Sequence, residues 1–428
     1  MSITPPLSGI RVIDFGRFIA GPYCAMLLAD MGADVIRVDR RQGSEDRYIA
    51  AITESGEGGG FLSLNRNKRN LTLDTSKPES AEIIRRLVKS ADVVVANLPN
   101  NVLKSMRLDY DSLKAIKPDI ILARISTFGP DGPYANRVGF DTVAQAMSGA
   151  MSLTGFAGTS TPEHAEAART AIPDRATSAR SGSPGSGGPG TPVRDIVPFE
   201  DYGTALHTAF GVMVALYHRA QTGEGQIVDG SLLATGITYV QGLLAERSVL
   251  GIERRQLGNT SFYAAPSDAY QTKDSWIVVS AVGNDMFARW ARLVGREDFI
   301  GDPRFASDQL RADNREPITE AMNAWLATRT TEQAIGELEK ARVPAGPVLN
   351  LQQVLDDPQV KARELLRYVD HPGAPKSVPL ADTAVRLSAT PGGVRMRAAA
   401  LGEHTDEVLR EIGYSEQEIA RLRRAEVV

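Results

Sequence analysis

Short aliphatic runs alternate with amphipathic stretches through the N-terminal part of the chain. The runs predict strands, and the stretches between them have the apolar spacing of helices. The predicted strands are Ile10–Phe15, Val35–Val38, Leu71–Asp74, Ala91–Ala96 and Ile120–Ile125, and the predicted helices are Tyr23–Met31, Ser80–Ser90 and Leu103–Ile116. Strands joined by helices in this order are typical of an α/β layer with a Rossmann-like parallel sheet.

A different pattern occupies the middle of the chain. Residues 178–192 (SARSGSPGSGGPGTP) consist almost wholly of Ser, Gly, Pro and Thr. Because such a segment buries too little surface to offset its ordering entropy, we expect a flexible surface loop over about residues 157–195. The best helical pattern follows at Tyr202–Thr222 and ends at Gly223, and Asp201 stands immediately before it.

The rest of the chain predicts a smaller domain and then a return to the first one. Past the long helix, a hairpin pattern at Tyr270–Ser280 is mixed with helical patterns, as in an α+β domain. Val343–Val348 marks the return, and the chain finishes in a charged helix at Ser415–Ala425. We expect a discontinuous large domain of residues 1–225 and 343–428, and a small domain with linkers of residues 226–342.

Composition narrows the possible partners. Of the 428 residues, 42% are hydrophobic and 23% are charged, which is ordinary for a folded soluble protein. The net charge of -4 gives no basic excess for nucleic acid. Cys24 is the only cysteine, so no internal disulfide and no multi-cysteine metal site can form. With neither a signal peptide at Met1–Gly9 nor a membrane-length apolar run, we expect an unexported, cytoplasmic protein without a membrane partner.

The first strand–helix–strand unit invites a comparison with dinucleotide-binding folds. Its turn, Asp14–Gly21, lacks the G-x-G-x-x-G spacing that lets a pyrophosphate approach the backbone. Arg40 and Arg41 at the end of the second strand are suited to a phosphate, and they are equally suited to be surface charges. An NADP-dependent oxidoreductase therefore stays only as an alternative.

Other common chemistries lack their motifs. The sequence has neither a Walker motif nor a G-x-S-x-G elbow, and its five histidines show no metal-ligand spacing, so we expect no metal and no permanently bound cofactor. Carboxylate chemistry remains, with Asp201 as its best candidate. Position alone favours an N-cap, and a cap and a nucleophile are compatible, because the helix terminus would hold the carboxylate ionised and its amides could stabilise an oxyanion.

Four segments, in their order and spacing, resemble class III CoA-transferases. This group contains formyl-CoA transferase, carnitine CoA-transferase and the related α-methylacyl-CoA racemase. The segments cover nearly the whole chain: Pro6–Asp14 leading to Ala20–Pro22, Asn65–Asp74 (NRNKRNLTLD), Asp201–Gln226 (DYGTALHTAFGVMVALYHRAQTGEGQ) and Leu401–Leu409 (LGEHTDEVL).

The resemblance implies a catalytic apparatus around Asp201 as the nucleophile. It places contacts to coenzyme A, a substrate as its thioester, on Phe18, Ala20, Arg40, Leu73, Asn97, Met106 and Phe140. On the side of the reacting acid it implies Ile19, Asp141, Gly258 and Asn259. The segment Gly258-Asn259-Thr260 matches a glycine-rich loop that shields the intermediates, although it has only one glycine.

Positions at which the chain departs from members of the family reduce the number of possible substrates and activities. Ile19 stands where formyl-CoA transferase has a catalytic glutamine, and Ser105 stands where it has an arginine, so formate and oxalate are poor substrate hypotheses. Phe140 stands where the racemase needs a histidine base, and phenylalanine cannot move a proton. A 2-methylacyl-CoA racemase stays as the first alternative.

The resemblance therefore favours a CoA-transferase that uses mixed anhydride and aspartyl-CoA thioester intermediates on Asp201. For the acceptor we favour a small C4–C5 dicarboxylate of the succinate, malate, citramalate or mesaconate type, because Arg47 could anchor a distal carboxylate; Arg17 is a second candidate, and carnitine-like and aryl acids stay open. The family also implies an interlocked homodimer, with the active site between the large domain of one chain and the small domain of its partner.

Overall fold

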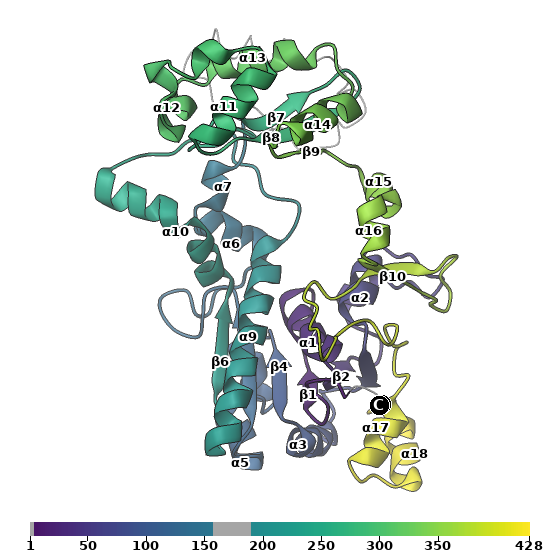
Figure 1. Cartoon of the computed structure of the whole chain (residues 1–428). Coiled ribbons are helices and arrows are strands. Elements are labelled where there is room, and N and C mark those ends of the chain that lie inside the picture. Colours follow the sequence, from purple (N-terminus) through teal and green to yellow (C-terminus); the bar gives the residue numbers. More distant parts are fainter. Residues whose placement is uncertain (1–3, 157–189) are drawn as a thin grey trace. The chain divides into compact units, whose positions relative to one another are not determined.

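The computed structural model describes residues 4–156 and 190–428 (Figure 1). The chain divides into two compact units: the first comprises residues 1–149, 195–241 and 358–428, and the second comprises residues 150–194 and 242–357. Most of the predicted loop of residues 157–195 lies outside the described residues. No helix in the described ranges is long and apolar enough to cross a membrane.

A parallel sheet of six strands forms the centre of the first unit, in the order β3-β2-β1-β4-β5-β6 among the described residues. This is the strand order of dinucleotide-binding Rossmann folds, which supports the mixed α/β prediction. Aliphatic runs make these strands because both faces of a parallel sheet are covered. The strands are β1 (Arg11–Asp14), β2 (Asp34–Asp39), β3 (Lys68–Thr72), β4 (Val93–Ala96), β5 (Ile121–Ser126) and β6 (Ile227–Ser231).

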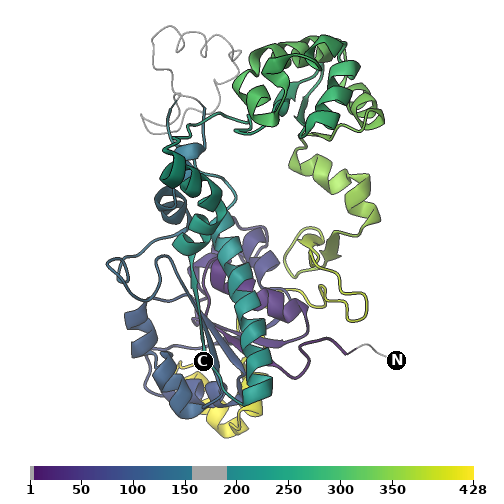
Figure 2. The same cartoon turned by 60° about the vertical axis from the view of Figure 1, so that its left-hand side comes forward.

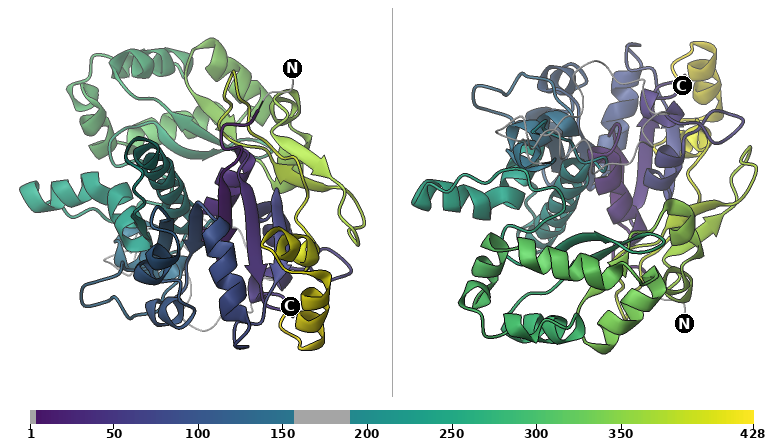
Figure 3. Two further views of the ribbon diagram at one scale, coloured as in Figure 1. Left: turned by 90° about the horizontal axis from the view of Figure 1, so that it is seen from below. Right: turned by 90° about the horizontal axis from the view of Figure 1, so that it is seen from above.

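Helices cover both faces of this sheet. Helices α1 (Ala20–Asp30) and α9 (Phe199–Thr222) pack together on one face, over a core that includes Val12, Val35 and Val93. Figure 2 shows α9 running alongside β6. The opposite core contains Ile13, Ile36 and Val94 and is covered by α3 (Ser80–Ser90), α5 (Tyr110–Ile116), α17 (Thr405–Glu411) and α18 (Glu416–Arg424). The C-terminal helices are drawn in yellow in Figure 3, and α17 contacts β3.

The predicted helix Leu103–Ile116 is wrong as one element. The structure has two helices there, α4 (Asn100–Ser105) and α5, separated by Arg107 at a φ of 55°. Asp109 caps α5 through its side chain, which accepts a hydrogen bond from the N–H of Ser112. Apolar spacing continues across the break, so periodicity alone does not reveal the turn.

The remaining elements of the first unit surround the sheet. Among them, β10 and β11 pair antiparallel and pack on α2 around Phe61 and Leu62. They are η1 (Glu45–Tyr48), α2 (Gly59–Leu64), α6 (Asp141–Met147), α16 (Pro358–Ala362), β10 (Leu366–Val369) and β11 (Val378–Ala381). Helix α10 (Leu232–Leu250) begins in the first unit and extends into the second.

The second unit has its own antiparallel sheet, in which β8 lies between β7 and β9 among the described residues. The predicted hairpin at Tyr270–Ser280 is confirmed by β7 and β8. The core of this unit centres on Trp290, with Phe299 stacked beside it. Its elements are α7 (Ala150–Leu153), β7 (Ser267–Gln271), β8 (Trp276–Ser280), α11 (Asn284–Leu293), η2 (Glu297–Phe299), η3 (Pro303–Phe305), α12 (Asp308–Asp313), α13 (Glu316–Leu326), α14 (Thr331–Lys340), β9 (Ala345–Pro347) and α15 (Leu351–Asp356).

Two strands pair with the sheet on the other side of a domain boundary predicted from the sequence. β6 follows residue 226 yet pairs with β5 in the large sheet, and β9 follows residue 343 yet pairs with β8 in the smaller sheet. Strand pairing decides both positions, and the local pattern of a short strand does not show which sheet it joins. The division into domains at residues 226 and 343 stays a prediction.

Candidate active site

The order of the strands reverses between β1 and β4, where the loops after both strands meet. The side-chain oxygen of Asn97 accepts a hydrogen bond from the N–H of Arg17 at 2.7 Å, and its Nδ2 donates to the carbonyl of Arg17 at 2.8 Å. Open α/β sheets bind ligands at the carboxyl ends of their strands, at such a reversal. Four predicted CoA contacts follow strand ends here, namely Phe18 after β1, Arg40 after β2, Leu73 after β3 and Asn97 after β4.

Asp201 lies in the first turn of α9 rather than before the helix. The helix begins at Phe199, with Pro198 at its N-cap, so the prediction that Asp201 directly precedes the helix is wrong. The cap is supplied from α6 instead: Asp141 Oδ1 accepts hydrogen bonds from the N–H of Glu200 at 2.9 Å and of Asp201 at 3.0 Å. Capping by a carboxylate typically stabilises a helix by about 1 kcal/mol. The side chain of Asp201 is thereby relieved of a capping role.

The carboxyl of Asp201 is harder to ionise than an exposed aspartate. Burial, and then the negative charge of Asp141, raise its pKa to about 7. The helix terminus was expected to hold this carboxylate ionised, but the two amides nearest to it donate to Asp141, and they are not free to stabilise an oxyanion either. Near neutral pH, Asp201 is therefore poised between a protonated acid and a poorly solvated, reactive carboxylate.

A second carboxyl, Glu200, lies beside it and was missed by the sequence analysis. Glu200 is 0% exposed, and its Oε1 accepts a hydrogen bond from Ser148 Oγ at 2.8 Å. Its Oε2 has no hydrogen-bond partner among the described residues. Burial raises the pKa of Glu200, the hydrogen bond from Ser148 opposes this, and the charges of Asp141 and Asp201 add to it, so that the pKa of Glu200 is about 7. The only sequence signal was a second acid next to Asp201, which is common on helix starts.

Two aromatic rings meet near this acidic cluster. Phe18 and Phe140 pack edge to face with ring centroids 5.3 Å apart, and they are 36% and 62% exposed. Phe140 is the N-cap residue of α6 and directly precedes Asp141. The structure therefore brings together three of the predicted site positions, Phe18, Phe140 and Asp141, with Asp141 hydrogen-bonded to the main chain of Asp201.

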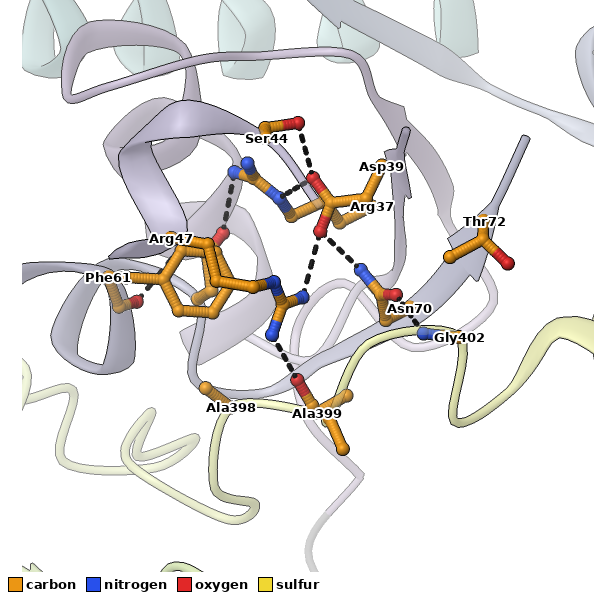
Figure 4. Close-up of polar contacts among 12 residues, drawn as sticks. Arg37, Asp39, Ser44, Arg47, Phe61, Asn70, Thr72, Ala398, Ala399 and Gly402 are labelled. Atoms are coloured by element: carbon orange, nitrogen blue, oxygen red, sulfur yellow. Dashed lines mark hydrogen bonds and ion pairs between the residues drawn. The ribbon is translucent and has the colours of Figure 1, made fainter. Parts of the chain in front are cut away.

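A buried ion-pair network lies under the loop after β2 (Figure 4). Asp39 accepts hydrogen bonds from Arg37 Nε at 3.0 Å, Arg47 Nη2 at 2.8 Å, Ser44 Oγ at 2.8 Å and Asn70 Nδ2 at 2.9 Å. In dinucleotide-binding folds, an acid at this strand end takes the ribose hydroxyls. Because Asp39 is buried and fully occupied, it is not free to take a ribose hydroxyl. Arg40 and Arg41, the candidate phosphate ligands, pair with Glu45 and Glu426 respectively.

Arg47 lies inside that network. It is 1% exposed, pairs with Asp39, donates to the carbonyl of Ala399 at 3.2 Å and lies over the ring of Phe61. Its predicted role as the anchor of a distal carboxylate stays a prediction, and this network would have to open for it. Arg17 is similarly engaged, since Nη1 donates to the carbonyls of Phe15, Gly16 and Val38.

The other predicted positions differ in how accessible they are. Arg40 is exposed and pairs with Glu45 at 2.6 Å. Leu73 and Ala20 are each 1% exposed, and Met106 packs against the core, whereas Ile19 is half-buried at the N-cap of α1. Their contacts to CoA stay predictions.

Gly258 and Asn259 belong to the second unit, whereas Asp201 belongs to the first. Gly258 has a φ of 64°, and its N–H donates to the carbonyl of Gly155 at 2.8 Å. A β-carbon at this position would lie 3.2 Å from the ring of Phe156, so both space and backbone favour glycine. Its shielding role stays a prediction.

Comparisons with known proteins agree with this arrangement. Residues 7–405 match the model of the family described as CoA-transferase family III. The chain is 32% identical to succinyl-CoA–D-citramalate CoA-transferase of Chloroflexus aurantiacus, covering 99% of this chain and 98% of that protein. It is 34% identical to succinyl-CoA:mesaconate CoA-transferase of Haloarcula hispanica, covering 95% and 96%. It is 30% identical to human succinyl-CoA:glutarate CoA-transferase, covering 100% and 91%.

Solved structures show the same fold. A CAIB/BAIF family protein from Brucella suis superposes with a TM-score of 0.78 at 30% identity, over 96% of this chain and 100% of that one. The protein Rv3272 from M. tuberculosis superposes with a TM-score of 0.77 at 26% identity, over 95% and 100%.

Proposed function

Since the chain belongs to CoA-transferase family III and is therefore a CoA-transferase, we propose that Asp201 is its nucleophile. The observation that supports this most is the placement of Asp201. Its main chain is fixed by Asp141, its side chain is spared from capping, and burial makes its carboxylate poorly solvated near neutral pH.

The reaction needs four exchanges at acyl carbons. The Asp201 carboxylate attacks the carbonyl of the acyl-CoA donor, which forms a mixed anhydride and releases CoA thiolate. The thiolate attacks the aspartyl carbonyl, which forms an aspartyl-CoA thioester and releases the donor acid. The acceptor carboxylate attacks this thioester, which gives a second anhydride and thiolate again. Attack of the thiolate on the acceptor's acyl carbon yields the new acyl-CoA and restores the Asp201 carboxylate.

For the substrates we propose a small C4–C5 dicarboxylate acceptor and an acyl-CoA donor. Support comes from the relatives, which are named as CoA-transferases between succinyl-CoA and citramalate, mesaconate or glutarate. Arg17 and Arg47 are the candidate anchors near the strand ends, and the contacts of both would have to rearrange to meet a carboxylate.

Two experiments test whether Asp201 is the nucleophile. Wild-type protein and Asp201→Asn are given succinyl-CoA with a panel of acids, and the products are read by mass spectrometry. We expect exchange with dicarboxylates only in the wild type, with CoA binding kept in the variant. Hydroxylamine added during turnover should mark Asp201 as the hydroxamate; labelling of another residue would move the nucleophile.

The same assay addresses the racemase alternative. Racemisation of a 2-methylacyl-CoA incorporates solvent deuterium at the α-carbon and needs no acceptor acid. We expect no incorporation, because Phe140 offers no group to accept the α-proton. Deuterium uptake that survives in the absence of any acid would favour the racemase.

We also propose that the chain forms the interlocked homodimer implied by its family and works in the cytoplasm. Large apolar side chains at helical spacing lie exposed along α9 within the first unit, a pattern that marks a protein interface. They are Leu206, Phe210, Met213, Val214 and Tyr217. Light scattering should give twice the chain mass for the wild type, and Phe210→Glu should shift it toward the monomer.

A further inference from the structure

We propose that Asp46 is a positioning residue for the acyl-CoA site, because it holds the main chain of Phe18 in place. The proposal rests on the proposed function and adds a residue that neither the sequence pattern nor the family comparison assigns. Asp46 lies in η1, after β2, and is 7% exposed.

Two partners fix the carboxylate of Asp46. Its Oδ2 accepts a hydrogen bond from the N–H of Phe18 at 3.2 Å, and the guanidinium of Arg37 donates to Oδ1 at 3.0 Å and to Oδ2 at 2.9 Å. One carboxylate thus joins the loop after β1 to a side chain of β2.

Arg37 is itself fixed by other contacts. Its Nε donates to Asp39 Oδ1 at 3.0 Å, and its Nη1 donates to Asn65 Oδ1 at 3.1 Å. Figure 4 shows Arg37 and Arg47 both bonded to Asp39, and both guanidinium groups lie over the ring of Phe61. Because Arg37 has no freedom to follow Asp46, the position of Asp46 is set by the sheet rather than by the loop it supports.

The loop needs this support because Phe18 has a φ of 59°. Bulky L-residues avoid this left-handed region, and they stay in it only where surrounding contacts compensate the strain. The contacts here are the hydrogen bond from Phe18 N–H to Asp46 and the pair of hydrogen bonds between Arg17 and Asn97. Without Asp46, the main chain at Phe18 is expected to relax toward a negative φ.

Relaxation of Phe18 would move its ring away from Phe140. The two rings contact each other at 5.3 Å, and Phe140 leads directly into Asp141, which holds the N–H of Asp201. The exposed aromatic pair is therefore placed by two supports, Asp46 under Phe18 and α6 under Phe140. We infer that Asp46 governs the binding of the acyl-CoA thioester against these rings, and that it does not touch the acceptor acid.

Steady-state kinetics of Asp46→Ala test this inference. We expect the KM for the acyl-CoA donor to rise about tenfold, with kcat falling less than threefold and the KM of the acceptor acid changing less than twofold. Asp46→Asn keeps one oxygen for the N–H of Phe18 but sets an NH2 group against Arg37, so a threefold rise in donor KM is expected. If Asp46→Ala does not fold, Asp46→Asn decides the question.

Glu57→Gln and Glu57→Ala are the matched controls. Glu57 is also buried and lies 3.6 Å from Arg47 in the same network, but its side-chain hydrogen bonds within the described part of the chain join it to Thr53 and Ser55 and do not reach the Phe18 loop. Each Glu57 variant should lower thermal stability as much as its Asp46 counterpart and leave the donor KM unchanged. If the donor KM rises as much in the Glu57 variants as in the Asp46 variants, Asp46 has a merely structural role and the proposal is overturned.

A double-mutant cycle with Phe18→Gly gives an independent outcome. Glycine adopts positive φ without strain and has no ring, so Asp46→Ala should change the donor KM less than twofold in that background. An undiminished tenfold effect would contradict the inference. The proposed function is contradicted by different results from those that contradict the inference on Asp46. These results are a wild type that exchanges no CoA, or an Asp201→Asn variant that stays active.

Discussion

The carboxylate of Asp141 accepts the hydrogen bond from the N–H of Asp201 at 3.0 Å, so the residue that caps α9 is not the residue proposed to react. Asp141 is the first residue of α6, and Asp201 lies in α9, a helix that starts much later in the chain. The same carboxylate also raises the pKa of Asp201, after the effect of burial. One contact therefore couples the position of the proposed nucleophile to its protonation.

Asp141→Asn is expected to move the pH dependence of the reaction. The substitution removes the negative charge that disfavours ionisation of Asp201, so the acid limb of kcat/KM, near pH 7 in the wild type, should shift down by about half to one pH unit. An asparagine oxygen can still accept both amides, and kcat on the plateau should change less than about threefold. The measurement is kcat/KM for succinyl-CoA between about pH 5 and 9, a range that spans the raised pKa.

Asp141→Ala is the companion variant, since it removes both the charge and the cap. It should show the same pH shift with an added loss of about 1 kcal/mol in the free energy of unfolding, the usual value of a side-chain cap. An unshifted acid limb in both variants would show that Asp141 does not act on Asp201.

Asp201→Asn is expected to stabilise the protein at alkaline pH. A carboxyl whose pKa is raised on folding contributes stability that is fully present below the unfolded pKa of about 4 and is lost as the pH rises through the folded pKa, about 7 here. At pH 8 the wild type holds a poorly solvated charge that the amide lacks. The free energy of unfolding of Asp201→Asn should therefore exceed that of the wild type by on the order of 1 kcal/mol, since the site is partly open to water.

Thermal melting of both proteins between about pH 4 and 8 checks this expectation. The variant's advantage in melting temperature should shrink as the pH falls and vanish near pH 4, where both side chains are neutral. Asp229→Asn, at an exposed ion pair with Arg124, serves as the control and should show no such dependence. A difference in melting temperature that stays constant at all pH values would show that the ionisation of Asp201 is not its cause.

Gly236→Ala is expected to disturb Glu200 directly. A β-carbon on Gly236 would lie 2.1 Å from Glu200 Oε1 and 2.6 Å from Ser148 Cβ, closer than atoms can pack. Overpacking of this kind typically costs about 1–3 kcal/mol in the free energy of unfolding. Activity should fall as well, because Glu200 and Asp201 are neighbours in the first turn of α9.

A second substitution shows whether Glu200 is the cause. Glu200→Ala removes the nearer of the two side chains that the new methyl group strikes, so the double variant should recover the part of the stability loss that Glu200 causes, as measured by chemical denaturation. Gly242→Ala, where the added carbon meets nothing within 4 Å, is the matched control. Additive losses would mean that Ser148 or the backbone receives the strain instead.

The parallel sheet was largely predictable because aliphatic runs report buried strands. β1, β2, β4 and β5 lie within one or two residues of their predicted ends, while β3 begins earlier, at Lys68, because its first residues are polar side chains in a buried network. Lys68 reaches Asp14 at 2.8 Å, and no local pattern announces a lysine that is buried by a partner so distant in sequence.

The candidate site was predictable only in part. Motif resemblance located Asp201, Phe18 and Phe140 along the chain, but the cap from Asp141, the buried Glu200 and the support of Phe18 by Asp46 all arise from contacts between distant segments. Charged residues in a sequence indicate solvent exposure by default. Arg47, predicted as a substrate anchor and found enclosed, illustrates how tertiary pairing overrides that default.

Asp39→Ala should be among the most destabilising single changes in the large sheet. Burial opposes the ionisation of Asp39, but Arg37 and Arg47 outweigh it and hold its pKa well below the usual range. Its removal leaves two buried guanidinium groups without their shared partner, a change that typically costs about 3–5 kcal/mol in the free energy of unfolding. Glu82→Ala, which breaks exposed pairs with Arg85 and Arg86, should cost less than about 1 kcal/mol. Urea denaturation of the two variants at pH 7 compares them; equal losses would mean that the network adds no more than surface pairs do, and that Arg37 does not depend on Asp39 to hold Asp46 in place.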